Sequence, residues 1–281
     1  MTVPLHSDLP AAGDPARPRL REALWLLAPA AVCLWTARFL GRDVIPWLIW
    51  QLVTLALGLA VWPLALRVTG SCGPSLVTGR AIGLLLVSLL QWELSYLGLV
   101  PFRGVTLWLL AAIVAALNWI PGHFRGAGRA AQALSSVRGR RDLLLFETLF
   151  LLLAGLWAVV RSRMPAINGL EKFMDYGFMM SLWRTDWLPA KDMWLAGQPI
   201  NYYYYGQYAY TVLDKMSGIL PATGYNLSLG SSMAWLFTLS GALLYRLFHS
   251  RPVLQWPAVL LGGFMTTFAG NSHAFFYSDN G

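Results

Sequence analysis

The chain has few charged residues and few cysteines for its length. Only 12% of its 281 residues are Asp, Glu, Lys or Arg, and only two are Cys. Cys33 lies in an apolar segment and Cys72 in a short connection, so no disulfide framework is expected. No glycine-rich phosphate loop of the Walker or Rossmann type is present, and the histidines lack the spacing of a metal site. These absences argue against a disulfide-stabilised secreted domain, a nucleotide-binding domain of those types and a histidine-based metal centre.

Apolar and aromatic residues dominate instead. The chain is 57% hydrophobic, contains 14 Trp and has a mean hydropathy of +0.52, which is typical of membrane proteins. Seven segments are apolar and long enough to be read as transmembrane helices. They are residues 24–40, 44–66, 81–102, 104–121, 143–160, 216–245 and 252–276. The sequence therefore predicts an all-α polytopic transmembrane helical bundle of about seven spans.

Arginine and lysine indicate the orientation, because cytoplasmic connections accumulate them. Basic residues precede the first span, flank the second connection at Arg67 and Arg80, and fill the segment 122–141. Alternation through seven spans puts these on one side, so we expect a cytoplasmic N-terminus in the cell (plasma) membrane and an external loop 161–222. Attraction to the inner leaflet then explains the net charge of +8, and no nucleic-acid partner is expected.

These features divide the chain into four regions. We expect a disordered cytoplasmic tail (1–21) without a cleavable signal peptide and an N-terminal four-helix membrane region (22–121). A flexible basic cytoplasmic linker (122–141) and a second membrane region (142–281) with the external loop follow. Residues 203–219 are apolar enough for a span, but Asp214 and Lys215 favour a juxtamembrane helix or hairpin.

The external loop concentrates polar chemistry. Glu171 and Asp175 are four residues apart, so on a helix they share one face and can act as acid and base or bind a divalent cation. Lys172, Arg161 and Arg163 supply cations at the membrane surface, where a lipid-linked phosphate would lie. The alternative is that Glu171 pairs with Lys172 or Arg161 and simply solvates the loop.

The later part of this loop contains four consecutive tyrosines, 202–205. Asn201 and Gln207 offer amides beside aromatic faces such as Tyr203, a combination suited to sugar rings, and Asp192 extends the acidic set. The alternative is that the tyrosines anchor the chain at the membrane interface.

Glu93 and Glu147 interrupt predicted spans. Acids inside a membrane favour a proton relay or transport site, so a transporter or channel using these two residues is the rival function. Structural hydrogen bonding by both acids, and a non-catalytic membrane scaffold, are further alternatives.

Two blocks of the loop resemble a family of bacterial and archaeal membrane proteins named for a Tyr-Tyr-Tyr motif. Gly169-Leu-Glu-Lys-Phe-Met-Asp-Tyr-Gly-Phe is similar to the family's Glu-Lys-Pro-Met-Asp-Phe block, with Phe173 where proline is usual. Asp192-Met-Trp-Leu-Ala-Gly-Gln-Pro-Ile-Asn-Tyr-Tyr-Tyr-Tyr-Gly-Gln is similar to its Tyr-rich block. Family members are usually longer, so this chain is expected to be an N-terminal portion, incomplete at its C-terminus.

The family is similar in layout to polyprenyl-phosphate-dependent glycosyltransferases of the GT-C fold. This resemblance implies a sugar transferase at the outer face, with a lipid-linked sugar donor and an unknown acceptor. It implies Asp175 as the catalytic carboxylate, with Glu171 as its partner or as a ligand of Mg²⁺ or Mn²⁺. Fold-level analogy alone does not fix function, so the rival readings stay open at this stage.

Overall fold

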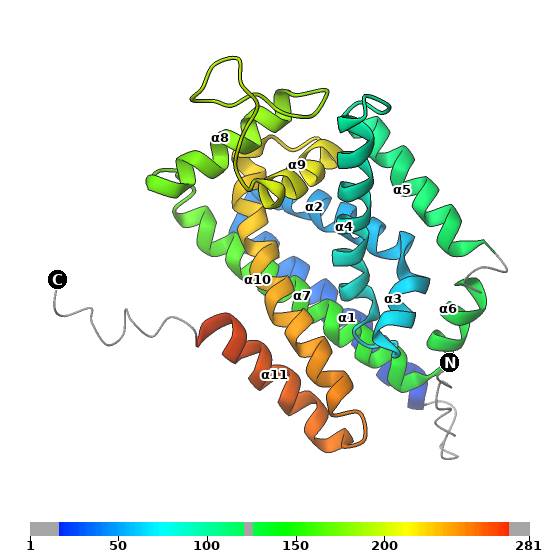
Figure 1. Cartoon of the computed structure of the whole chain (residues 1–281). Coiled ribbons are helices and arrows are strands. Elements are labelled where there is room, and N and C mark those ends of the chain that lie inside the picture. The colour runs from blue at the N-terminus through cyan, green and yellow to red at the C-terminus, as the bar shows by residue number, and fades with distance from the viewer. Residues whose placement is uncertain (1–16, 121–125, 270–281) are drawn as a thin grey trace.

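The computed structural model describes residues 17–120 and 126–269, and these residues form helices joined mostly by short connections, with a longer segment between residues 184 and 205 (Figure 1). An isolated antiparallel bridge joins Lys191 to Pro199, and no longer strand occurs in the described ranges. The helices are α1 (Arg17–Leu40), the 3-10 turn η1 (Gly41–Asp43), α2 (Val44–Ala60), α3 (Trp62–Thr69), α4 (Ser75–Tyr96), α5 (Gly104–Trp119), α6 (Gly126–Ser135), α7 (Val137–Arg163), α8 (Leu170–Arg184), α9 (Tyr205–Ser217), α10 (Pro221–Leu247) and α11 (Pro252–Phe268). The predicted all-α class is confirmed.

Four helical segments in the described residues are long and apolar enough to cross a membrane. They are Leu27–Ala60, Ser75–Tyr96, Val137–Arg163 and Pro221–Leu247. The first covers most of two predicted spans, 24–40 and 44–66, because only the three-residue turn η1, in which Gly41 has φ +57°, separates α1 from α2. The predicted spans 104–121 and 252–276 are the shorter apolar helices α5 and α11. The structure therefore supports a helical membrane protein with four candidate spans, and a total of seven stays a prediction.

Several predicted boundaries move. The predicted span 44–66 is interrupted at Val61, where α2 gives way to α3. The predicted span 216–245 contains the boundary between α9 and α10, where Gly218 adopts φ +71°. The predicted linker 122–141 contains α6 and the first turn of α7, while the predicted tail lies mostly outside the described residues. The short helices α3 and α6 were not predicted from the sequence, because tertiary packing, more than intrinsic propensity, stabilises them.

Close helix contacts build the core. α7 packs along α1 and α10, α2 crosses α4, and α10 pairs with α11 (Figure 1). The crossing of α2 and α4 is tight, because a Cβ on Gly83 would collide with the carbonyl oxygen of Leu57. Small residues at such contacts let helix backbones approach, which increases dispersion contacts in a membrane protein. Trp47, Trp50 and Phe150 fill the adjoining interior.

Arg80 does not lie in a cytoplasmic connection, contrary to the prediction. It lies in α4, is 2% exposed, and pairs with Glu147 of α7 at 2.5 Å between Nη2 and Oε2. Its Nη1 donates to the carbonyl oxygen of Gln51 and to the hydroxyl of Thr54, so α2, α4 and α7 meet at one guanidinium. The prediction was wrong because α4 begins at Ser75, before the purely apolar run, and because a buried partner neutralises the charge.

Glu93 and Glu147 do not lie together. Glu147 is bound to Arg80, whereas Glu93 is exposed and lies thirteen residues further along α4. At 1.5 Å per residue this separation is about 20 Å along the helix. A shared ion or proton site for these two acids, on which the transporter reading depends, has no support in this arrangement.

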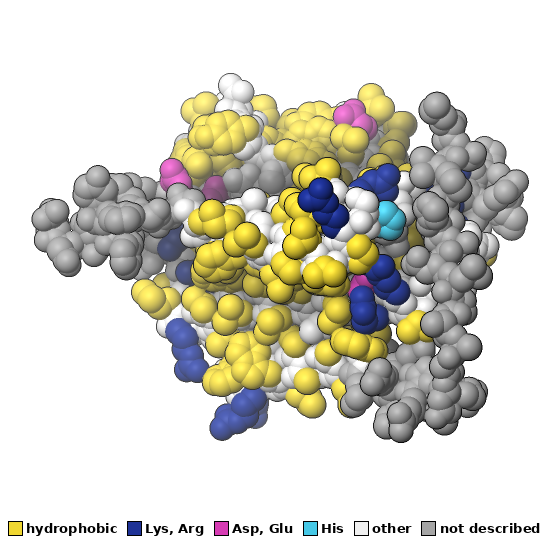
Figure 2. All heavy atoms as spheres, turned by 90° about the horizontal axis from the view of Figure 1, so that it is seen from below, with side chains coloured by type: hydrophobic (Ala, Val, Ile, Leu, Met, Phe, Trp, Pro, Cys, Tyr) yellow, Lys and Arg dark blue, Asp and Glu magenta, His cyan; other side chains and the backbone are white. Residues whose placement is uncertain are grey.

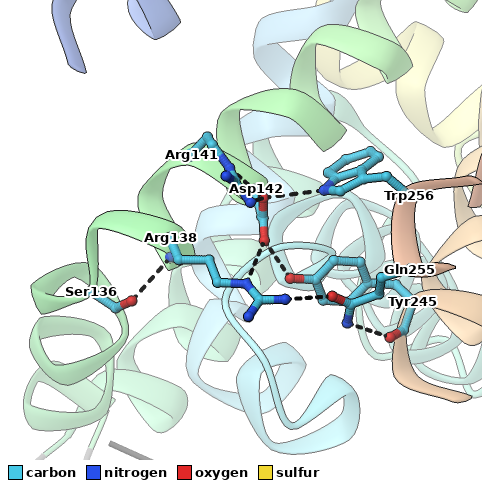
Figure 3. A network of polar contacts seen from close by, with 8 residues as sticks. Ser136, Arg138, Arg141, Asp142, Tyr245, Gln255 and Trp256 are labelled. Atoms are coloured by element: carbon cyan, nitrogen blue, oxygen red, sulfur yellow. Dashed lines mark hydrogen bonds and ion pairs between the residues drawn. The ribbon is translucent and has the colours of Figure 1, made fainter. Parts of the chain in front are cut away.

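A second polar network lies near the start of α7. The buried Asp142 carboxylate accepts hydrogen bonds from the Tyr245 hydroxyl and the Trp256 indole, and Arg138 lies 3.6 Å away (Figure 3). Gln255 accepts from Arg138 and donates to the carbonyl oxygen of Tyr245. These contacts fix α7 to the turn between α10 and α11. The lower face of the molecule shows Lys and Arg side chains among hydrophobic ones (Figure 2).

The uncertain segment 203–219 contains α9, which packs against α5, α8 and α10. Asp214 is fully buried on this helix, and neither of its carboxylate oxygens has a hydrogen-bond partner among the described residues. It contacts α10 at Gly224, where a Cβ would overlap the carboxylate. Burial raises the pKa of Asp214 well above its usual range, so the acid is held in its neutral form.

Replacement of Arg80 by Met is expected to destabilise the protein by about 3–5 kcal/mol, because Glu147 is left buried without its cation. Thermal unfolding in detergent measures the effect. The double substitution of Arg80 and Glu147 by Met should recover most of the loss, since no buried charge then remains. A matched change at the exposed Arg42 should leave the melting temperature nearly unchanged. Equal melting of R80M and R42M would contradict the structural role of the pair.

Asp214→Asn is expected to stabilise the protein at pH 8 and to do so less at pH 5. The folded protein holds the Asp214 proton more tightly than the unfolded chain. The contribution of this acid to stability is therefore full below its usual pKa of about 3.9 and is lost as pH rises toward the raised pKa. Asparagine keeps the shape and does not titrate. A gain of about 3 °C at pH 8 corresponds to roughly 1 kcal/mol for a chain of this size.

The control for this experiment is Asp186→Asn. Asp186 is exposed and its hydrogen bond to Arg103 lowers the pKa of its carboxyl, so its replacement should not stabilise at pH 8. A pH-independent difference between D214N and the unmodified protein would rule out a buried neutral Asp214.

Candidate functional site

Helix α8 carries the two predicted catalytic acids. It begins after Gly169, whose φ of +114° suits glycine at the turn out of α7. Phe178, Met179 and Leu182 are at most 2% exposed, so this helix packs into the protein. Glu171 and Asp175 are one turn apart near its start, as predicted from their spacing.

Asp175 is held in place by α9. Its Oδ1 accepts a hydrogen bond of 2.7 Å from Nε2 of Gln207, and the carboxylate is half-buried. Glu171 is exposed beside it. The structure thus brings together Asp175 and Gln207, which were both predicted as site residues. The Gln207 hydrogen bond occupies Oδ1 of Asp175 and does not involve Oδ2 or the exposed Glu171 carboxylate.

The tyrosine run divides between the inside and the outside of the protein. Tyr204 is 5% exposed and its hydroxyl shares a hydrogen bond with that of Tyr96, while the Tyr205 hydroxyl pairs with Ser88. Both rings pack on Trp92 of α4. Tyr202 and Tyr203 face outward, with Tyr203 79% exposed. Only half of the run is therefore available to a ligand.

Tyr202 borders the two acids. Its hydroxyl donates to Tyr203 at 2.6 Å, and this bond is the main cause of the raised pKa of Tyr202. Burial contributes less, and so do the charges of Glu171 and Asp175, which lie near enough to act on the hydroxyl. The charges of both predicted acids therefore act on this exposed tyrosine.

A cavity of about 440 Å³ lies at the end of α7, between α8 and the start of α10. Its wall is apolar at Leu40, Ala158, Pro165, Ile167, Ala222 and Leu227. Its polar lining comprises Asp43, Arg161, Ser162, Tyr176, Thr223 and Asn226. Arg161 is oriented by Asn226, whose Oδ1 accepts from the arginine Nε at 2.9 Å. The cavity therefore combines one guanidinium with walls that suit hydrocarbon.

Two tyrosines connect this cavity to Asp175. Tyr176 lines the cavity, directly follows Asp175 in α8 and packs edge-on against Tyr225 at 6.4 Å between ring centroids. Tyr225 interacts electrostatically with both Asp175 and Arg161. The charges of the predicted acid, Asp175, and of the predicted phosphate-binding cation, Arg161, therefore both act on Tyr225. Asn226 and Tyr225 were missed by sequence reading, although an Asn at the polar start of an apolar helix is a usable signal.

The other predicted residues are placed elsewhere. Arg163 is exposed at the last turn of α7 and does not line the cavity; Lys172 is half-buried beside Glu171; and Asn201 is exposed. Asp192 lies in a groove of about 680 Å³ on the face of α8 that carries Gly177, Ser181 and Arg184, opposite to Asp175. Its carboxylate accepts from the backbone N–H groups of Trp194 and Leu195, so it stabilises a turn.

A charged cluster secures the far end of α8. The Lys215 ammonium donates to the carbonyl oxygens of Phe102 and Thr185, both at 2.6 Å, and lies 4.0 Å from the centre of the Phe102 ring. Burial lowers the pKa of Lys215 to about 8. Arg103 and Asp186 form an exposed ion pair nearby. This cluster ties α9 to the loop before α5 and to the end of α8, which fixes the helix pair that holds Asp175.

No group of three or more His, Cys, Asp or Glu side chains that could hold a metal occurs in residues 17–120 and 126–269. Glu171 and Asp175 are therefore two protein carboxylates without a third. Mg²⁺ is often held by one or two carboxylates together with substrate phosphates, so this pair fits such an ion only when a phosphate is also bound.

Comparison with protein families matches residues 86–279 to a family described as uncharacterised membrane protein, DUF2298. The match extends over well over half of the chain and includes α8, the tyrosine run and α9. It agrees with the resemblance to an uncharacterised family of membrane proteins. Comparison with curated proteins and with solved structures gives no match. The chain therefore belongs to the DUF2298 family of membrane proteins.

Proposed function

We propose that the protein is a membrane glycosyltransferase that moves a sugar from a polyprenyl-phosphate donor to an acceptor at the outer face. The observation that carries this proposal is the pairing of a positioned carboxylate, Asp175, with an amphipathic cavity containing Arg161. Tyr176, which directly follows Asp175, lines this cavity and packs against Tyr225. The GT-C-like layout, the seven spans and the external position of α8 are parts of the same proposal.

In this mechanism Asp175 acts as the general base. The acceptor hydroxyl oxygen forms a bond to the anomeric carbon, the bond from that carbon to the phosphate oxygen breaks, and the hydroxyl proton passes to Asp175. The lipid phosphate leaves with the electron pair of the broken bond. Gln207 orients the base through Oδ1 and leaves Oδ2 for the acceptor. Glu171, one turn away, is the proposed partner and, with Asp175 and a donor phosphate, the proposed holder of Mg²⁺ or Mn²⁺.

Arg161 and its cavity are the proposed site of the donor phosphate. A guanidinium binds phosphate oxygens through paired N–H groups, and Asn226 keeps this one oriented. The apolar walls match the first isoprene units of a polyprenyl chain, because burying them removes apolar surface from water. Lys172 and Arg163 remain as proposed secondary cations at the rim of the site.

Asp175→Asn is expected to lower sugar transfer by about 10²–10⁴-fold, since asparagine cannot accept the proton. The assay uses the full-length protein in liposomes with radiolabelled polyprenyl-phosphate hexoses and a mixture of glycan, lipid and peptide acceptors. Glu93→Gln is the matched control, because Glu93 is an exposed acid of α4 outside the site. Transfer retained by D175N would remove Asp175 as the base. Loss in E93Q with retention in D175N would assign the role of the base to Glu93 instead.

Arg161→Gln is expected to raise the KM for the lipid donor about tenfold while kcat falls less, because the lost contact is made in the ground state as well. Initial rates at varied donor concentration separate the two constants. Arg251→Gln is the control, as Arg251 is exposed at the opposite end of α10. An unchanged KM in R161Q would place the donor phosphate elsewhere.

A further inference from the structure

Three exposed aromatic side chains gather beside the acidic face of α8. Tyr203 is 79% exposed, Trp194 is 68% exposed and Tyr202 is 43% exposed. We call these three residues the aromatic platform. Large rings left open to solvent on an ordered segment mark interaction sites more often than isolated apolar residues do. The platform is not used by the proposed donor cavity, so a separate ligand is needed to explain it.

The platform is supported from below. The rings of Tyr202 and Tyr203 stack with centroids 4.0 Å apart and planes 29° apart, and their hydroxyls are hydrogen-bonded. Buried Phe178 of α8 contacts both Tyr202 and Trp194, at 5.9 and 6.3 Å between ring centroids. Trp194 and Tyr202 therefore lie around one buried ring, although eight residues separate them in sequence.

The backbone that presents Trp194 is also fixed. Asp192 accepts from the N–H groups of Trp194 and Leu195 at 2.7 and 2.9 Å. The N–H of Asp192 donates to Gln198, and that of Ile200 donates to Ala190, which closes a short hairpin. A preorganised surface binds with less loss of conformational entropy than a mobile one. The structural role of Asp192 is thus to hold the tryptophan.

The chemistry of this surface suits a neutral sugar ring. Aromatic faces are electron-rich and attract the polarised C–H groups on one face of a pyranose, whose hydroxyls need partners at the edges. The platform contains no cation, and the exposed amides of Gln198 and Asn201 lie in the same segment. The segment between α8 and α9 also rises beyond the upper ends of α4 and α10 (Figure 1), which favours a ligand in water over lipid.

We propose that the aromatic platform binds a saccharide acceptor and presents one of its hydroxyls to Asp175. The inference rests on the proposed function for the role of acceptor, and on the platform alone for sugar binding. Its link to the reaction is Phe178, which lies three residues after Asp175 on α8 and contacts the Tyr202 ring at 5.9 Å between centroids. A pyranose stacked on Tyr202 and Tyr203 would present a hydroxyl to Asp175, and the proton of that hydroxyl would pass to Asp175 as the new glycosidic bond forms.

The test is saturation-transfer NMR on the full-length protein in nanodiscs, in the Asp175→Asn background so that no transfer consumes the ligand. The probes are neutral trisaccharides of glucose, mannose, galactose and N-acetylglucosamine. We expect ring C–H signals of at least one probe to receive saturation, and Tyr203→Ala or Trp194→Ala to weaken its binding about tenfold. Tyr203→Phe, which keeps the ring, should retain most of the binding. Trp187→Ala is the control, because Trp187 is similarly exposed but lines the opposite groove.

Absence of saturation transfer to every probe, or binding that survives both alanine substitutions, overturns the proposal. A nitroxide at position 203 distinguishes the membrane alternative: greater accessibility to dissolved oxygen than to a water-soluble nickel complex would place the platform in lipid and also overturn it. Sugar binding in the absence of any transfer activity would leave the platform standing and reject the glycosyltransferase. Transfer to lipid or peptide acceptors without sugar binding would support the glycosyltransferase and reject the saccharide site on the platform.

Discussion

The ion pair between Glu147 and Arg80 is the constraint on which the packing of the spans depends. Both side chains lie inside a helix bundle, where an unpaired charge would be costly and where each can be neutralised only by the other. Because Arg80 also binds α2 through Gln51 and Thr54, the pair sets the mutual position of α2, α4 and α7. The close approach of α2 to α4 at Gly83 then follows, since the guanidinium can reach α2 only across a short gap.

α7 also makes polar contacts near both of its ends. At one end Asp142 binds the turn between α10 and α11 through Tyr245 and Trp256. At the other end Arg161 meets Asn226 at the start of α10. One helix thus carries a buried polar contact near each end and an ion pair between them. The cavity beside Arg161 is built on a helix that is held at three places along its length, as a precise binding site requires.

The sequence predicted what depends on local spacing. Helix α8 and the shared face of Glu171 and Asp175 follow from helical periodicity and residue type. The hydrogen bond from Gln207 to Asp175 spans 32 residues, and no local pattern encodes such a contact. Arg80 was misplaced for the same reason: beside an apolar run an arginine usually reaches toward water, and only the distant Glu147 makes burial possible. Asp192 was predicted as a site residue because it is an acid in the same loop, but its carboxylate accepts hydrogen bonds from backbone N–H groups.

The division of the tyrosine run gives the segment a fixed register. Tyr204 and Tyr205 pack on Trp92, while the two preceding rings stack in solvent, so the boundary between structure and surface falls between neighbouring residues. A single-residue deletion within the run would keep its composition almost intact but would move one outward ring to an inward position. Such a deletion would change the length of the segment while leaving its residue types almost the same. Exchange of one aromatic residue for another should therefore disturb this segment less than a change in the number of residues between α8 and α9.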